Sequence, residues 1–236
     1  MYIIEGTIGA GKSTFLKLIA PFFPEMAIVY EPLHAWQNNT ESPSLLEHFY
    51  REPQRWAYTM ETLIMISRVQ EHLKEQNNSS CIKLMERSIY SGHYCFTYNS
   101  YQQGFLTELE WNIYLAWFNF LIPQKCRAPR GFIYLQVDPE IAHGRIKKRS
   151  RKGEDAIPLE YLKQLDKRHT DFLIHKNNIL PELMTVPVLV LNCNKEFEAD
   201  SQEFLGHVEK VRSFMYQGVI KSVSDHIFNL PSPYIL

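Results

Sequence analysis

The sequence has no excess of charge of one sign. Its 25 Lys and Arg residues nearly balance its 26 Asp and Glu residues, which leaves a formal net charge of -1. A protein that mainly binds nucleic acid usually carries a strongly basic surface, so this balance argues against that class. We therefore expect no nucleic-acid partner.

Cysteine is scarce, and the few cysteines present follow no metal-binding pattern. The four are Cys81, Cys95, Cys126 and Cys193, without CxxC spacing. Neither a disulfide framework nor a zinc site is expected from such spacing. The sequence predicts free thiols in a reducing compartment.

Long apolar runs are missing as well. No run reaches about 18 residues, the length needed to cross a bilayer. The chain begins directly with Tyr2-Ile3-Ile4, without a basic region or a cleavage site. We expect a cytoplasmic protein with no membrane partner and no secretory signal.

Short apolar runs instead alternate with longer amphipathic ones. The expected strands are rich in β-branched, aliphatic and aromatic residues, and they are 2–5, 27–30, 82–85, 132–137 and 186–191. The expected helices are 12–20, 54–76, 107–122, 139–150 and 158–175. This order predicts an α/β protein with a five-stranded parallel sheet flanked by helices. We expect one domain over 1–214 and a loosely packed extension over 215–236.

A glycine-rich loop follows the first predicted strand. Residues 6–13 read GTIGAGKS and fit the pattern G-x-x-x-x-G-K-[ST], the P-loop. Its backbone N–H groups surround a phosphate, Lys12 reaches the β- and γ-phosphates, and the Ser13 hydroxyl can bind Mg²⁺. The loop leads into a predicted helix, whose N-terminus also favours anions. The sequence therefore predicts a protein that binds a nucleoside triphosphate.

Acidic and basic groups follow the other predicted strands. Glu31 comes after the second strand and Glu86 after the third. The carboxyl ends of parallel strands meet at one edge, so both should lie beside the phosphate loop. Asp138 ends the fourth strand; it could hold Mg²⁺, but we favour it as a helix N-cap.

Taken together, these motifs resemble those of the deoxynucleoside kinase family, the deoxycytidine, deoxyguanosine and mitochondrial thymidine kinases. The likeness spans roughly residues 1–214. It rests on segments in the same order: 6–14, Glu31-Pro-x-x-x-Trp36, Tyr50-x-x-Pro53-x-x-Trp56, Glu86-Arg87-Ser88-x-Tyr90-Ser91, Arg145-x-x-x-Arg149-x-Arg151 and Ile157-Pro158-Leu159-x-Tyr161-Leu162. The resemblance implies a three-layer P-loop NTPase fold and transfer of the γ-phosphate of ATP to a deoxynucleoside 5′-hydroxyl.

The resemblance also implies roles for particular residues. Glu31 would be the general base for the 5′-hydroxyl, with Arg87 and Lys12 completing the catalytic set. Ser13 and Glu86 would hold Mg²⁺. The residues expected to bind ATP are Gly6, Thr7, Ile8, Gly9, Ala10, Gly11, Lys12, Ser13, Thr14, Arg145, Arg149, Arg151 and Phe197. Of these, the three arginines would form a lid over the triphosphate, and Arg149 with Phe197 would stack on adenine.

Other positions would bind the acceptor. Tyr50 and Glu154 resemble the pair that holds the sugar 3′-hydroxyl. The full expected set is Glu31, Trp36, Tyr50, Met60, Glu61, Arg68, Arg87, Phe96 and Glu154.

The sequence departs from the family where the base would bind. The family usually has Phe-Gln at the positions of Met60 and Glu61, and an ionised Glu61 can only accept hydrogen bonds. Arg68 matches an arginine of deoxycytidine and deoxyguanosine kinases, but its usual aspartate partner is replaced by Gly92. We expect Glu61 to become the partner of Arg68, and deoxyguanosine, deoxyadenosine or deoxycytidine to be preferred over thymidine.

Two alternatives remain open at this stage. One is a nucleoside monophosphate kinase of the thymidylate type, and the other is a non-catalytic nucleotide-binding module. By family analogy we also expect a homodimer. Trp111, Tyr114, Trp117 and Phe118 could form its apolar face, or they could belong to the core.

Overall fold

The computed structural model describes residues 1–32, 44–78, 82–151, 154, 157–197 and 201–228, with side chains described up to 216. The chain folds into two compact units, Met1–Phe197 and Glu198–Leu236. The boundary expected near 214 stays a prediction.

The first unit is built on a parallel sheet. Its strands are β1 (Tyr2–Glu5), β2 (Met26–Val29), β3 (Ile82–Glu86), β4 (Gly131–Gln136) and β5 (Val188–Asn192). They lie in the order β2-β3-β1-β4-β5, and every neighbouring pair is parallel. The predicted five-stranded parallel sheet is confirmed. Because β1 is central, the loop after it lies next to the ends of both β3 and β4.

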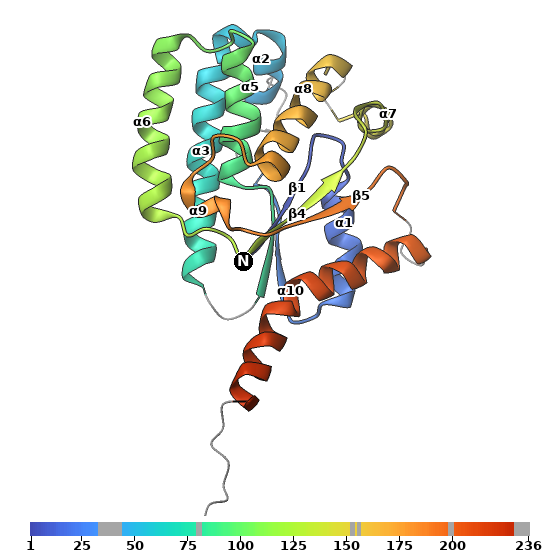
Figure 1. Ribbon diagram of the computed structural model, residues 1–236. Helices are drawn as coiled ribbons and strands as arrows, with labels where there is room; N and C mark the ends of the chain where they lie inside the picture. Colours follow the sequence, from blue (N-terminus) through green and yellow to red (C-terminus); the bar gives the residue numbers. More distant parts are fainter. Residues whose placement is uncertain (33–43, 79–81, 152–153, 155–156, 198–200, 229–236) are drawn as a thin grey trace, which may run out of the picture. The chain divides into compact units, whose positions relative to one another are not determined.

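Helices cover the sheet on its two faces. They include α1 (Lys12–Ile19), α3 (Pro53–Asn77), α6 (Glu108–Lys125), α7 (Pro139–Arg149) and α8 (Leu159–Thr170). Figure 1 shows α3 and α6 on one side of the sheet and α1 on the other. All five were expected from the sequence. The helix expected over 158–175 leaves α geometry at Thr170 and continues as the π-helical segment η4 (Asp171–His175).

Several shorter helices were not expected. They are α2 (Leu45–Arg51), α4 (Ile89–Ser91), the π-helical η3 (Gly92–Thr97), α5 (Tyr98–Gln102), α9 (Pro181–Met184) and the 3-10 turn η1 (Ala20–Phe22). Helices α4, η3 and α5 follow one another directly. Most of the residues in this run are buried, so no amphipathic stripe exists from which a helix could be recognised.

Helix α2 has a clear reason to begin where it does. The Ser44 hydroxyl accepts from the Glu47 backbone N–H at 3.2 Å, and the Glu47 carboxylate accepts from the Ser44 N–H at 2.8 Å. This reciprocal pair is a capping box, which satisfies backbone donors that the first turn leaves free. It fixes the helix that carries Phe49 and Tyr50.

The core between the sheet and one helical layer is aromatic and aliphatic. Strand residues Ile3, Met85 and Phe132 pack there with Tyr114 and Phe118 of α6. Tyr114 and Phe118 therefore belong to the core, with about 1.5–3 kcal/mol gained for each large apolar side chain that is fully buried. Trp117 is 49% exposed, so the group of four aromatic residues divides between core and surface.

The second unit contains α10 (Gln202–Phe228). Helix α10 runs past residue 214, where the sequence suggested a loosely packed extension, and how that extension packs stays a prediction. No helix in the described ranges has the length and hydropathy needed to cross a bilayer.

Three of the four cysteines lie in the part of the chain that the structure describes. Cys95, Cys126 and Cys193 are buried and form no disulfide with one another, and the reducing compartment stays a prediction. Cys81 lies outside the described residues. Burial raises the pKa of the Cys95 thiol well above its ordinary value, so it stays protonated.

Candidate functional site

A cavity of about 300 Å³ opens at the carboxyl ends of the central strands. Most of the residues expected from the sequence line it: Ile8, Gly9, Gly11, Lys12, Ser13, Thr14, Glu31, Tyr50, Met60, Glu61, Arg68, Glu86, Arg87, Phe96, Arg149, Arg151 and Glu154. Trp36 lies outside the described residues. The sequence patterns thus converge on one place, with the glycine-rich loop at one end and α3 at the other.

The glycine-rich loop wraps tightly between β1 and α1. Gly9 and Gly11 have φ angles of 80° and 87°, in the left-handed region that favours glycine. A Cβ on Gly9 would lie 2.4 Å from the Ala142 carbonyl oxygen. Both the turn and the close approach of α7 therefore require glycine at this position.

Lys12 is buried and folds back onto its own loop. Its ammonium donates to the carbonyls of Gly6 at 3.0 Å and Thr7 at 2.8 Å. Burial, together with the nearby Arg87, lowers the pKa of Lys12 to about 7. A bound anion would favour the charged form and raise this pKa again. Binding of a phosphate beside Lys12 would therefore favour the charged ammonium.

Ser13 and Glu86 meet at the start of α1. The Ser13 hydroxyl donates to Glu86 Oε1 at 2.6 Å, and the Glu31 backbone N–H donates to Glu86 Oε2 at 3.4 Å. One hydroxyl and one carboxylate are the kind of oxygen ligands that Mg²⁺ takes alongside substrate phosphates and water. Within the described ranges, no cluster of three or more acidic, His or Cys residues suggests an all-protein metal cage.

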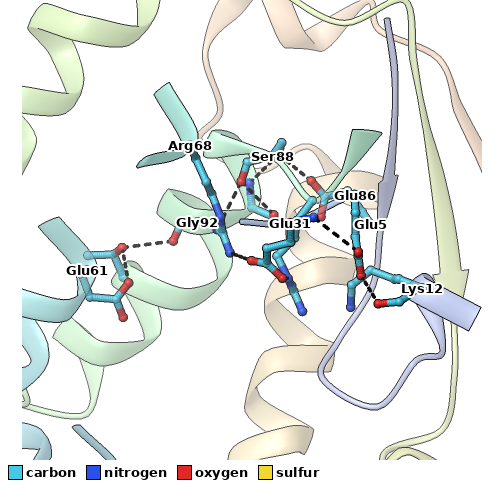
Figure 2. Close-up of polar contacts among 12 residues, drawn as sticks. Glu5, Lys12, Glu31, Glu61, Arg68, Glu86, Ser88 and Gly92 are labelled. Carbon is cyan, nitrogen blue, oxygen red and sulfur yellow. Dashed lines mark hydrogen bonds and ion pairs between the residues drawn. The ribbon is translucent and has the colours of Figure 1, made fainter. Parts of the chain in front are cut away.

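Glu31 lies between the guanidinium groups of Arg68 and Arg87, and Figure 2 shows its contact with Arg68. Its Oε1 accepts from Arg68 Nη2, and its Oε2 accepts from Arg87 Nε at 3.4 Å. Burial alone would raise the pKa of Glu31, but Arg68 and Arg87 outweigh it and lower the pKa to about 2. The carboxylate is therefore ionised throughout the physiological range.

Arg87 has an uncommon backbone conformation. Its φ is 65°, in the left-handed region, where bulky residues are rare. Its N–H donates to the Ile4 carbonyl at 2.9 Å, and its Nη1 donates to the Gly6 carbonyl at 3.2 Å. The guanidinium also lies 4.6 Å from the Phe96 ring centre. Such strain is found at sites where a side chain must be aimed precisely.

The three predicted lid arginines make different contacts, and their role as a lid stays a prediction. Arg149 and Arg151 both contact the Glu154 carboxylate, the second at 3.1 Å. Arg145 instead donates to the carbonyls of Asn194 and Lys195, at 3.2 and 2.7 Å. Glu154 is buried and shares the cavity with Tyr50.

Arg149 and Phe197 were predicted to stack on adenine, and that role stays a prediction. Arg149 contacts Glu154 and lines the cavity. The guanidinium over the Phe197 ring, 5.9 Å from its centre, is that of Arg145. Phe197 also packs edge-on against Phe15, with 5.4 Å between ring centres.

Glu61 is held by two hydroxyls that the sequence analysis did not single out. Ser100 donates to Oε1 at 2.9 Å and Thr97 donates to Oε2 at 3.0 Å. Thr97 Oγ1 also lies 3.2 Å from the Tyr114 hydroxyl. Burial raises the pKa of Glu61 to about 7, although both hydroxyls stabilise the anion. Glu61 therefore changes charge near neutral pH.

The expected pair of Glu61 with Arg68 is wrong, since Arg68 binds Glu31 instead. Thr97 and Ser100 could have been predicted as partners of Glu61 only if the helical run 89–102 had been recognised in the sequence.

Asp138 is at the N-cap position of α7, as expected, but its carboxylate does not cap the helix. It accepts from Asn194 Nδ2 at 3.0 Å, and its backbone N–H donates to Asn194 Oδ1 at 2.8 Å. This reciprocal pair joins the ends of β4 and β5 and leaves Asp138 outside the cavity lining.

Comparison with known proteins agrees with this geometry. The sequence model of the family described as "Deoxynucleoside kinase" matches residues 2–216. The mitochondrial deoxyguanosine kinase of Xenopus laevis is 35% identical over 222 residues, covering 84% of this chain and 83% of the relative. Deoxycytidine kinase 2 of Gallus gallus is 34% identical, covering 90% and 89%.

A thymidine kinase is also similar. Mitochondrial thymidine kinase 2 of Homo sapiens is 32% identical over 195 residues, which are 83% of this chain and 71% of the relative. The matches thus include kinases named for purine and for pyrimidine nucleosides. The whole cavity lies within the matched region. The chain belongs to the deoxynucleoside kinase family, the ATP-dependent kinases of deoxynucleosides.

Proposed function

We propose that this chain transfers the γ-phosphate of ATP to the 5′-hydroxyl of a deoxynucleoside and prefers deoxyguanosine, deoxyadenosine or deoxycytidine over thymidine. The observation that carries the proposal is the single cavity that runs from Lys12 and Ser13, past Glu31, to Glu61. A phosphate donor fits one end and a base the other, with a carboxylate between them.

The loop end would bind ATP. Backbone N–H groups of Gly6–Thr14 and the Lys12 ammonium would hold the phosphates, while Arg149 and Arg151 would neutralise charge from the opposite side. Arg149 and Phe197 would stack on the adenine, with the Arg145 guanidinium beside the Phe197 ring. Ser13 and Glu86 would hold Mg²⁺, which supplies charge neutralisation of the phosphates when bound.

The middle of the cavity would bind the sugar. Glu31 would accept the 5′-hydroxyl proton, and Arg87, anchored on the Gly6 carbonyl, would stabilise charge beside it. Tyr50 and Glu154 would bind the 3′-hydroxyl. Trp36 is proposed here from the motif alone.

The base preference rests on Glu61. When ionised, it only accepts hydrogen bonds, which suits amino groups of cytosine and adenine and the N–H edge of guanine. Thymine has a carbonyl oxygen, O4, where cytosine has an amino group. This oxygen would face the Glu61 carboxylate, and two acceptors cannot form a hydrogen bond with each other. An unpaired buried acceptor costs about 1–3 kcal/mol, enough for a clear preference.

A turnover panel tests the proposal directly. The four deoxynucleosides and their 5′-monophosphates are incubated with ATP and Mg²⁺, and the products are identified by chromatography. We expect the 5′-monophosphates of deoxyguanosine, deoxyadenosine or deoxycytidine as main products. Thymidine as the best acceptor would contradict the base preference, and turnover of monophosphates alone would point to a monophosphate kinase.

We also propose that the protein is a homodimer through α6. Leu109, Ile113, Trp117 and Phe120 are exposed apolar residues of this helix, from 40% to 70% exposed. Spacings of four, four and three residues place them along one side, and exposed apolar patches of this kind often mark interfaces. Light scattering should give twice the chain mass, and Trp117→Glu should give the monomer.

A cytoplasmic location also stays a prediction, since two of the relatives named above are mitochondrial.

A further inference from the structure

Arg68 joins two parts of the cavity that serve different purposes. It lies on α3, the helix that also carries Glu61, yet its guanidinium reaches the Glu31 carboxylate. Its Nη1 donates to the Ser88 carbonyl at 3.3 Å. Both side chains of the ion pair are largely buried, with 6% and 11% exposed. Helix α3 therefore contacts the candidate general base directly.

Gly92 provides the space for this contact. Its φ and ψ are -50° and -54°, which any residue adopts, so the backbone does not require glycine here. An added Cβ would instead lie 2.8 Å from Arg68 Nη1. A side chain at position 92 would therefore collide with the Arg68 guanidinium. Glycine at this position leaves room for Arg68 where Figure 2 shows it.

Arg68 also has a buried donor, Nε, that finds no hydrogen-bond partner among the residues that the structure describes. A buried unpaired donor costs about 1–3 kcal/mol, so a ligand with an acceptor atom would relieve this cost. Arg68 lines the cavity beside Ile64 and Glu61, where a nucleobase would lie.

Both carboxylate oxygens of Glu31 are occupied by guanidinium donors. Oε1 accepts from Arg68 Nη2, and Oε2 accepts from Arg87 Nε at 3.4 Å. A general base needs an oxygen within hydrogen-bond reach of the proton that it takes. Loss of the Arg68 contact would free Oε1 for that purpose.

We propose that Arg68 is a positioning residue, which holds Glu31 in the empty site and releases it when a base with an acceptor atom draws the guanidinium toward itself. This inference rests on the proposed function. Glu31 would then stay fixed by Arg87 alone and turn toward the 5′-hydroxyl. A purine N7 or O6, or a cytosine N3 or O2, has the required acceptor chemistry. Recognition of the base would thereby set the reactivity of the general base.

The test compares a deoxynucleoside with 1,2-dideoxyribose, which has the hydroxyl but no base. With Arg68 present, the base should increase kcat at least tenfold. This ratio should fall toward one in Arg68→Gln and Arg68→Lys, because an ammonium cannot bridge Glu31 and the Ser88 carbonyl as a guanidinium does. A higher KM with an unchanged kcat ratio would mean that Arg68 only binds the base.

The two levels of failure are distinguishable. If the unchanged protein phosphorylates no deoxynucleoside, the proposed function fails and the role of Arg68 fails with it. If the unchanged protein is active but the kcat ratio does not respond to substitution of Arg68, only the role of Arg68 is refuted. Circular dichroism of each variant confirms that the fold is retained, and Arg68→Lys is the variant that best preserves it.

Discussion

The two ends of the cavity are built in different ways. The phosphate end is a contiguous loop whose shape comes from glycines and whose donors are mostly backbone groups. The base end is assembled from side chains of α3, η3, α5 and α6 that contact one another. A loop of this kind can be recognised in a sequence because its chemistry depends on local spacing. A side-chain network cannot, because its members meet only in the fold.

The largest effect should come from the phosphate end. Lys12→Met removes the ammonium that faces the triphosphate, and kcat should fall by about 10²–10³-fold with every deoxynucleoside. The order of substrates should stay the same, since the base end is untouched. Steady-state kinetics with the four deoxynucleosides measure this, with Lys74→Met on the exposed side of α3 as the control. A changed order of substrates would contradict the view that the phosphate end and the base end of the cavity act independently.

At the base end, Glu61→Gln should alter selection more than rate. Glutamine has both a donor and an acceptor, so it can pair with thymine O4. The ratio of thymidine to deoxycytidine turnover should rise by about tenfold, equivalent to about 1.4 kcal/mol. Competition assays with both nucleosides in one mixture give this ratio directly. An unchanged ratio would show that Glu61 does not contact the base.

We expect a smaller effect of pH on the choice between thymidine and deoxycytidine. Burial raises the pKa of Glu61 to about 7, so the neutral acid is present at pH 6 and the carboxylate at pH 8. The neutral form carries a proton that it can donate to thymine, and the charged form does not. The thymidine to deoxycytidine ratio should therefore fall by about threefold to tenfold from pH 6 to 8. In Glu61→Gln the ratio should be flat, and a slope there would assign the effect to another group.

The smallest effect concerns the support of the cavity wall. Ser44→Ala removes half of the capping box of α2, which carries Phe49 and Tyr50. The free energy of unfolding should fall by about 1 kcal/mol. Chemical denaturation measures this, and kcat with deoxycytidine should change by less than twofold. A large loss of kcat would mean that α2 is mobile enough for its cap to control the sugar site.

Much of the fold could be predicted from the sequence because its signals are local. Each strand is a short apolar run, and the long helices alternate with the strands in a regular order. The helical run 89–102 was missed because its residues are buried on nearly all sides, which removes the polar face that marks a helix.

The candidate site also contains residues that could be predicted from the sequence and residues that could not. Gly6–Ser13, Glu31 and Glu86 were expected together because strand ends converge in a parallel sheet. The partner of Arg68 was predicted incorrectly, since helical spacing on α3 says nothing of a carboxylate that follows another strand. Ser100 and Thr97 were missed because single hydroxyl residues occur throughout any sequence.

The π-helical segment η3 has a consequence for how this region can change. Its hydrogen bonds span five residues, so Gly92–Thr97 holds one residue more per turn than an α-helix does. The extra residue is taken up inside the segment, so deleting one residue there would restore α geometry and leave the following α5, with Ser100, facing nearly the same way. Closing the segment into an α-helix without a deletion would instead rotate everything beyond it by about 100°, and Ser100 would face away from Glu61. The orientation of Ser100 toward Glu61 therefore depends on the segment keeping its wider turn, even with every side chain intact.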